Sequence, residues 1–227
     1  MKPSCRYKKL LCIIALIFTV ITFNGYTQNT QGQKISMLNP AGDVKHPGRK
    51  FHNGYERAVT FRIAEQLQKG IEQKYNIRTI LTRMPGEEVI HLQNASFANR
   101  LKVSLFLHLA LYKEESSKPK IYIYHLVQDP VADFAHRTLP TLTFTPVNKA
   151  YLHSIHQTKT FGERMKLVLS THDNEALFDC CGVFGLPLKP LEGITQPALL
   201  IEIGASNEEK ITALIQPLID SLKFIAE

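Results

Sequence analysis

The sequence predicts an α/β fold, a single domain built on a largely parallel, twisted sheet with helices on both faces. Short apolar runs alternate with longer amphipathic stretches along the chain, a pattern typical of strand–helix–strand units. The chain has 227 residues and 44% hydrophobic content, enough for one substantial core. A second full domain is therefore not expected.

The expected strands are short runs of mostly branched apolar residues. Their apolar character is almost continuous rather than alternating, which favours strands that are covered on both faces. Such strands belong to the interior of a sheet with a layer of helices on each side. The runs are residues 35–38, 77–81, 103–109, 121–124 and 198–203.

Two stretches have the periodicity of amphipathic helices. Near the carboxyl end, Ser206 and Glu209 match a capping box before an apolar-periodic stretch that runs to residue 226, with a kink expected at Pro217. The other helix is expected over residues 55–74, where apolar residues recur at four-residue steps: Val59, Ile63, Leu67 and Ile71.

The amino-terminal segment has the features of an export signal. Residues 1–27 combine a basic start with an apolar run over residues 10–23, too short for a typical membrane span. No A-x-A cleavage pattern follows, so an uncleaved membrane anchor remains open. We expect an exported protein of the periplasm or cell envelope, with a linker at residues 28–34, the domain at 35–227 and an irregular, proline-containing insertion at 126–147.

The charge of the domain argues against a nucleic-acid-binding protein. The formal net charge is +7, and subtracting the four basic residues of the export segment leaves +3. No stripe of Lys and Arg with interleaved aromatic residues is present in the sequence. The two cysteines outside the export segment, Cys180 and Cys181, are adjacent and predict no disulfide framework.

Three ionisable residues occupy positions where the pattern calls for apolar ones. Glu56 projects into the apolar stripe of the first helix, His108 interrupts an apolar strand, and Glu202 lies late in another. Ligands of open α/β sheets bind beyond the carboxyl ends of the strands, where these groups should converge. A helix-terminal Glu56, a hydrogen-bonded core His108 and a salt-bridged Glu202 remain the alternatives.

One histidine and two glutamates at one edge resemble a hydrolytic zinc site, and longer motifs point to a known family. The sequence resembles the zinc-dependent N-acetylmuramoyl-L-alanine amidases of the Amidase_3 type, which hydrolyse peptidoglycan. The matching motifs occur in the family's order and span nearly all of the expected domain: GYERAVTFRIAEQL (54–67), ILTR (80–83), Ala98 with Asn99, LFLH (105–108) and PALLIEIGASNEEK (197–210).

The resemblance implies that Glu56 and His108 are zinc ligands and that Glu202 is the acid that transfers protons. It also exposes a departure, because Gly42 stands where the family has its first zinc histidine. Two neighbours could replace that ligand. We favour His46, since imidazole is the commoner zinc ligand, with Asp43 as the alternative.

Two functions follow from the resemblance. The first is hydrolysis of the amide between N-acetylmuramic acid and L-alanine by a zinc-activated water. The alternative is an inactive amidase-like domain that binds peptidoglycan or regulates its hydrolysis. Peptidoglycan is the expected partner in both, and the resemblance allows for an activator protein and for residues 126–147 acting as a lid over the groove.

Overall fold

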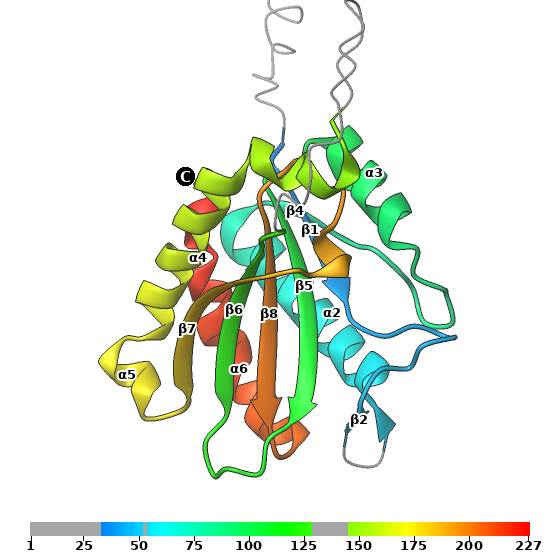
Figure 1. Cartoon of the computed structure of the whole chain (residues 1–227). Helices are drawn as coiled ribbons and strands as arrows, with labels where there is room; N and C mark the ends of the chain where they lie inside the picture. Colours follow the sequence, from blue (N-terminus) through cyan, green and yellow to red (C-terminus); the bar gives the residue numbers. More distant parts are fainter. Residues whose placement is uncertain (1–32, 52–53, 129–144) are drawn as a thin grey trace, which may run out of the picture. The chain divides into compact units, whose positions relative to one another are not determined.

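The fold is a six-stranded mixed sheet with helices on both faces (Figure 1). The computed structural model describes residues 33–51, 54–128 and 145–227. The expected export signal lies outside these residues, as does most of the expected insertion. The strands of the sheet are β1 (Ile35–Pro40), β4 (Arg78–Leu81), β5 (Leu105–Lys113), β6 (Lys120–Leu126), β7 (Asp179–Leu186) and β8 (Ala198–Ala205).

The strand order is β4-β1-β5-β8-β6-β7, and the first four strands are parallel. β6 runs antiparallel to β8 because the chain reverses directly after β5, and β7 then pairs parallel with β6. The prediction of a largely parallel sheet is confirmed, with a reversed pair of strands at one edge. β2 (Lys50–Phe51) and β3 (Gly54–Tyr55) form a separate small ribbon.

One face of the sheet carries the larger helices, α2 (Glu56–Tyr75), α4 (Ile155–Leu169) and α6 (Glu208–Ser221). The expected stripe of α2 is buried from Val59 to Ile71. α2 ends where Asn76 adopts a left-handed conformation and donates its backbone N–H to Glu72. The α2–α6 crossing is tight, since a Cβ on Gly70 would lie 2.2 Å from Cδ1 of Ile219.

The start of α6 differs from the expected capping box by one position. The residue that caps the helix is Asn207, whose side chain accepts the backbone N–H of Lys210 at 3.0 Å. Ser206 therefore lies outside the helix. The helix continues through Pro217 to Ser221, and a 3₁₀ turn, η3 (Lys223–Ile225), follows it.

The other face is covered by smaller elements: α3 (His91–Leu101) and the 3₁₀ turns η1 (Val147–His153) and η2 (Lys189–Leu191). Their apolar residues, among them Ala95, Ala98 and Leu191, pack with Met37 and Phe106 of the sheet. A short helix, α5 (His172–Glu175), precedes β7. Within the described residues, no helix has both the length and the apolar character needed to cross a membrane.

Candidate functional site

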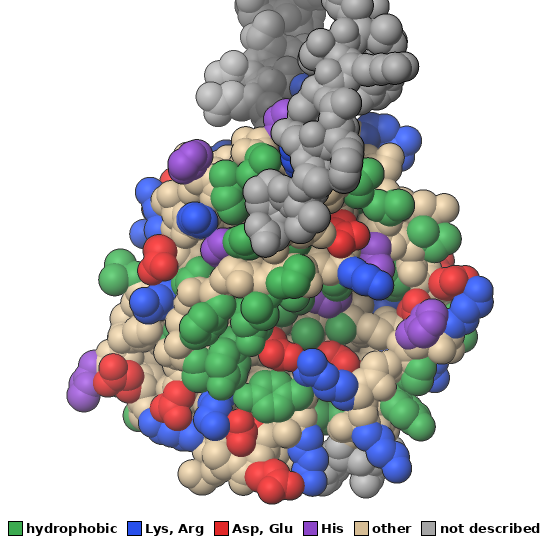
Figure 2. All heavy atoms as spheres, viewed as in Figure 1, with side chains coloured by type: hydrophobic (Ala, Val, Ile, Leu, Met, Phe, Trp, Pro, Cys, Tyr) green, Lys and Arg blue, Asp and Glu red, His purple; other side chains and the backbone are tan. Residues whose placement is uncertain are grey.

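His108 and Glu202 lie on the same face of neighbouring parallel strands. His108 of β5 pairs in register with Leu200 of β8, and Ala110 pairs with Glu202. Because side chains alternate along a strand, both ionisable groups face away from α2 and α6. On this face, acidic and basic side chains meet beside a patch of hydrophobic side chains (Figure 2).

Glu56 reaches the same region from the first turn of α2. β1 pairs with β5 only as far as Leu109, so the next stretch of the β5 edge has no strand partner there. Glu56 occupies this place: its Oε1 accepts the N–H of Leu111 at 2.7 Å, and its Oε2 accepts the N–H of Arg49 at 3.0 Å. The carboxylate is only 5% exposed and satisfies backbone donors that would otherwise be buried without a partner.

Arg49 connects the two glutamates. Its Nη1 donates to Oε1 of Glu202 at 2.5 Å and to the carbonyl oxygen of Leu111 at 3.2 Å. The hydroxyl of Tyr124 donates to the other Glu202 oxygen at 3.2 Å. Both carboxylates of the site therefore have both oxygens engaged by donors of the protein.

The electrostatics of the site reflect these contacts. Burial alone would lower the pKa of Arg49, but its hydrogen bond with Glu202 and the charges of Glu202 and Glu56 outweigh burial and raise it. Burial, followed by the negative charge of Glu202, raises the pKa of Tyr124 to about 12. Around neutral pH, Arg49 is therefore a fixed cation and Tyr124 a neutral hydrogen-bond donor.

His108 is a buried, neutral imidazole. Its pKa falls to about 3, mainly because burial penalises the charged ring, with the charges of His91 and Arg83 adding to the effect. Its Nδ1 has no hydrogen-bond partner among the described residues. A neutral imidazole with an unused nitrogen is the form that can ligate a metal or accept a proton.

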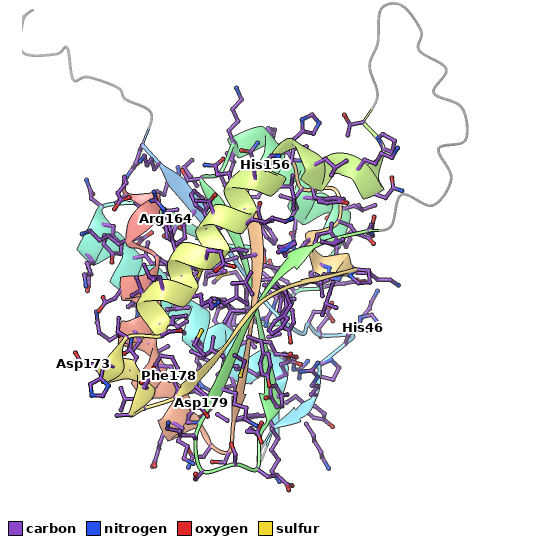
Figure 3. The ribbon with its side chains drawn as sticks, turned by 60° about the vertical axis from the view of Figure 1, so that its left-hand side comes forward. His46, His156, Arg164, Asp173, Phe178 and Asp179 are labelled. Carbon is purple, nitrogen blue, oxygen red and sulfur yellow. The ribbon has the colours of Figure 1, made fainter. Side chains whose placement is uncertain are left out.

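The two expected substitutes for the missing histidine have other contacts. Asp43 accepts three backbone N–H groups, from Lys45 at 2.8 Å, His46 at 2.5 Å and Val89 at 3.0 Å. These bonds outweigh the effect of burial and lower the pKa of Asp43. The His46 side chain is 82% exposed, with Nδ1 3.5 Å from Asp43, and lies at the periphery of the fold (Figure 3).

Gly42 itself has no space for a side chain in this backbone. Its φ is +75°, a left-handed conformation that side chains disfavour. A Cβ there would lie 2.7 Å from Cβ of Arg57 and 2.9 Å from the carbonyl oxygen of Pro47. A histidine at this position, as the sequence resemblance would have it, therefore requires the loop to move.

Arg83, the last residue of the ILTR motif, holds this loop in place. Its buried guanidinium donates to the carbonyl oxygens of Pro40 and Ala41, each at 3.2 Å, and of Arg57 at 2.8 Å. It thus fixes the turn after β1 against the first turn of α2. Its contribution to the site is one of positioning.

Zinc does not fit the site as it is arranged. Among the described residues, no group of three or more His, Cys, Asp or Glu side chains could hold a metal ion. Glu56 and His108 supply two candidate donors, whereas catalytic zinc sites usually have three protein ligands and one position for water. Of the two expected third ligands, Asp43 is engaged by three backbone N–H groups and His46 is turned to the surface.

Comparison with known proteins gives a result in structure alone, since no family model and no curated protein matches the sequence. The catalytic domain of CwlV, an N-acetylmuramoyl-L-alanine amidase from Bacillus (Paenibacillus) polymyxa var. colistinus, has a TM-score of 0.61 and 15% identity, over 85% of this chain and 97% of that one. The amidase AmiC2 of Nostoc punctiforme has a TM-score of 0.59 and 13% identity, over 86% and 99%.

The chain has the fold of the N-acetylmuramoyl-L-alanine amidases. A third amidase, CwlD of Clostridioides difficile, solved in complex with the GerS lipoprotein, has a TM-score of 0.52 and 16% identity, over 86% of this chain and 94% of that one. At these levels of identity the amidase fold defines the architecture and leaves the chemistry to the residues of the site.

Sequence reasoning missed Arg49, Tyr124 and His91. Arg49 follows a Pro-Gly pair in the loop after β1, but nothing in the sequence links it to Glu202, which lies 153 positions away. Tyr124 is part of an apolar strand run and has no distinguishing pattern. His91 opens α3 and affects the pKa of His108 through its charge, a proximity that only the folded chain reveals.

Proposed function

We propose that this protein acts at the bacterial cell wall, where its amidase fold binds peptidoglycan near the bond between N-acetylmuramic acid and L-alanine, without zinc-dependent hydrolysis. The observation that carries the proposal is the pairing of Glu202 with Arg49 in a fold shared with peptidoglycan amidases. Under this proposal the binding site lies around Glu56 and Glu202, whose carboxylates are held by the protein's own donors.

The composition of the site suits a polymer with both hydroxyl and charged groups. The unbonded part of the Arg49 guanidinium offers donors, the Tyr124 hydroxyl oxygen can accept while its hydrogen is given to Glu202, and the lone pairs of Glu202 that remain offer further acceptors at 18% side-chain exposure. The hydrophobic patch beside them offers contact for apolar surface of sugar rings and peptide side chains (Figure 2). A binding site of this kind needs no activated water.

A second candidate function is zinc-dependent hydrolysis of the same amide. One observation favours it: the neutral imidazole of His108, with its free Nδ1, lies on the same face as Glu202. His46, or Asp43 in its place, would have to leave its present contacts to complete the ligands. For this reason we place hydrolysis second.

Incubation of the purified protein with peptidoglycan sacculi tests both candidates. We expect the protein to sediment with the sacculi and to release no stem peptide with a new amino-terminal L-alanine, as measured by mass spectrometry. Zinc-dependent release of that peptide would establish the second candidate. In that case, Glu202→Gln should lower release by about 10² to 10⁴ if Glu202 transfers protons. Absence of binding would reject the first candidate.

The setting of this function is part of the proposal. The basic start and apolar run of residues 1–27 support export to the periplasm or cell envelope. If this segment is not cleaved, it would hold the protein at the membrane. An activator protein fits the same picture, because the CwlD amidase is seen in complex with a lipoprotein. Fractionation of cells that express the full chain tests the location.

A further inference from the structure

We propose that the guanidinium group of Arg49, in place of a metal ion, supplies the positive charge that organises Glu56 and Glu202 at this site. The inference deepens the proposed function, because it concerns how the same site is held together. The amidase fold leads one to expect a bound zinc there. In this chain the two acids are instead joined by one residue of the loop after β1.

Arg49 binds the two acids with different groups. Its backbone N–H donates to Glu56 Oε2 at 3.0 Å, and its side chain donates to Glu202 Oε1 at 2.5 Å. The backbone carbonyl of Arg49 in turn accepts the N–H of Glu56 at 2.9 Å. One backbone–backbone bond and one backbone–carboxylate bond thus hold the Arg49 backbone against Glu56, while the guanidinium end of the side chain is held by Glu202.

The β5 edge completes this arrangement. Leu111 donates its N–H to Glu56 at 2.7 Å and accepts Nη1 of Arg49 at its carbonyl oxygen at 3.2 Å. Leu111 of β5 is thus hydrogen-bonded to both Glu56 and Arg49. The acid and the base are therefore both held by Leu111, the carboxylate at its N–H and the guanidinium at its carbonyl oxygen.

The loop is shaped to deliver Arg49. Gly48, with a φ of +80°, directly precedes it, and a Cβ at Gly48 would lie 2.6 Å from Oε2 of Glu56. Only a residue without a side chain allows the loop to pass this close to the carboxylate. Gly48 therefore lets the loop pass close to the Glu56 carboxylate, and Arg49, the next residue, then reaches both acids.

Charge balance supports the same reading. Glu56 is buried and Glu202 is partly buried, and paired carboxylates in such places need a nearby cation. In the described residues, Glu202 forms its ion pair with Arg49, and the charge of Glu56 also acts on Arg49. An arginine stays protonated throughout the physiological range, so this cation is permanent and repels a divalent ion from the same place.

Thermal unfolding with excess zinc or with a chelator tests the inference on the full domain. We expect neither addition to change the Tm of the wild type. Arg49→Ala should lower the Tm by about 2–4 °C, as expected for loss of a partly exposed pair in a chain of this size. In the native arrangement Glu56, His108 and Glu202 form no metal-binding group. Loss of the guanidinium removes the ion pair that ties Glu202 to the loop after β1. The loop can then move and let the three side chains approach a zinc ion, so zinc should raise the Tm of Arg49→Ala.

Arg164→Ala is the matched control. Arg164 lies on α4, remote from the loop that carries His46 (Figure 3), and its side chain is 51% exposed, compared with 55% for Arg49. It also pairs with a glutamate, Glu227. Zinc should leave the Tm of this variant unchanged. A zinc response limited to Arg49→Ala supports the inference.

Two results would overturn the inference that Arg49 takes the place of a metal ion. One is a rise in the Tm of the wild type on addition of zinc, which would mean that the guanidinium does not take the metal's place. The other is equal behaviour of Arg49→Ala and Arg164→Ala in zinc. Wild-type sedimentation with sacculi is measured separately: if it fails while the zinc response follows Arg49, the proposed function falls and the role of Arg49 stands.

Discussion

Any side chain at position 42, including the histidine that the sequence resemblance places there, should destabilise this protein. The backbone at Gly42 has a φ of +75°, and a Cβ there would approach Arg57 Cβ to 2.7 Å and the Pro47 carbonyl oxygen to 2.9 Å. Neither neighbour is the end of a flexible side chain. The loop must therefore move before any side chain, including the imidazole of Gly42→His, can be accommodated.

The magnitude follows from two separable effects. A side chain in the left-handed region costs about 1–2 kcal/mol. Overpacking against atoms that cannot easily shift typically costs a further 1–3 kcal/mol or so. Gly42→Ala should thus lower the free energy of unfolding by about 2–5 kcal/mol. Gly86→Ala isolates the first effect, because Gly86 has a φ of +89° and nothing within 4 Å of its Cβ position.

Urea denaturation of Gly42→Ala, Gly42→His and Gly86→Ala provides the measurement. We expect both substitutions at position 42 to exceed the loss at position 86 by at least about 1 kcal/mol. The reasoning fails if Gly42→Ala and Gly86→Ala lose equal stability, because the close contacts would then contribute nothing. It fails more completely if Gly42→His is as stable as the wild type.

Three further predictions concern the acids, the buried imidazole and the loop. Glu56→Gln should lower the free energy of unfolding by about 1–3 kcal/mol, because an amide can accept only one of the two backbone N–H groups; equal denaturation midpoints would refute the capping role. The depressed pKa of His108, about 3, means that the unfolded chain gains a proton first as the pH falls. The contribution of His108 to the free energy of unfolding is therefore complete above the ordinary histidine pKa of about 6.5. It is lost progressively as the pH falls toward 3, and the loss at pH 5 is about 2 kcal/mol. His108→Leu should flatten the dependence of stability on pH between about 7.5 and 5, and an unchanged slope would show that the ring is not buried in neutral form. Arg83→Met should lower the Tm by several degrees, since it strips three carbonyl oxygens of a charged donor; a Tm equal to that of the wild type would show that the loop holds without it.

Much of the fold could be predicted because it rests on local periodicity. The stripe of α2 and the apolar runs of β5 and β8 are visible in the sequence and confirmed in the structure. α4 escaped prediction because its buried face includes Thr158 and Gly162, which do not register in an apolar pattern. α3 has a similar buried face, formed by two alanines.

Of the candidate site, only the faces on which the strand and helix residues lie could be predicted from the sequence. His108 and Glu202 stand out because strand alternation fixes the face on which they lie, and Glu56 because helix periodicity does the same. The loop after β1 follows no such period. The contacts of Asp43 and Arg49 depend on two left-handed glycines and on residues far along the chain, so no spacing rule could have paired Arg49 with Glu202.

The zinc content of the purified wild-type protein tests the central claim most directly. The protein is loaded with zinc, dialysed without chelator and analysed for metal. A site organised by Arg49 should retain far less than one zinc per chain. One zinc per chain would contradict the account, and loss of that zinc in His46→Ala would show that His46 leaves the surface to complete a metal site with Glu56 and His108.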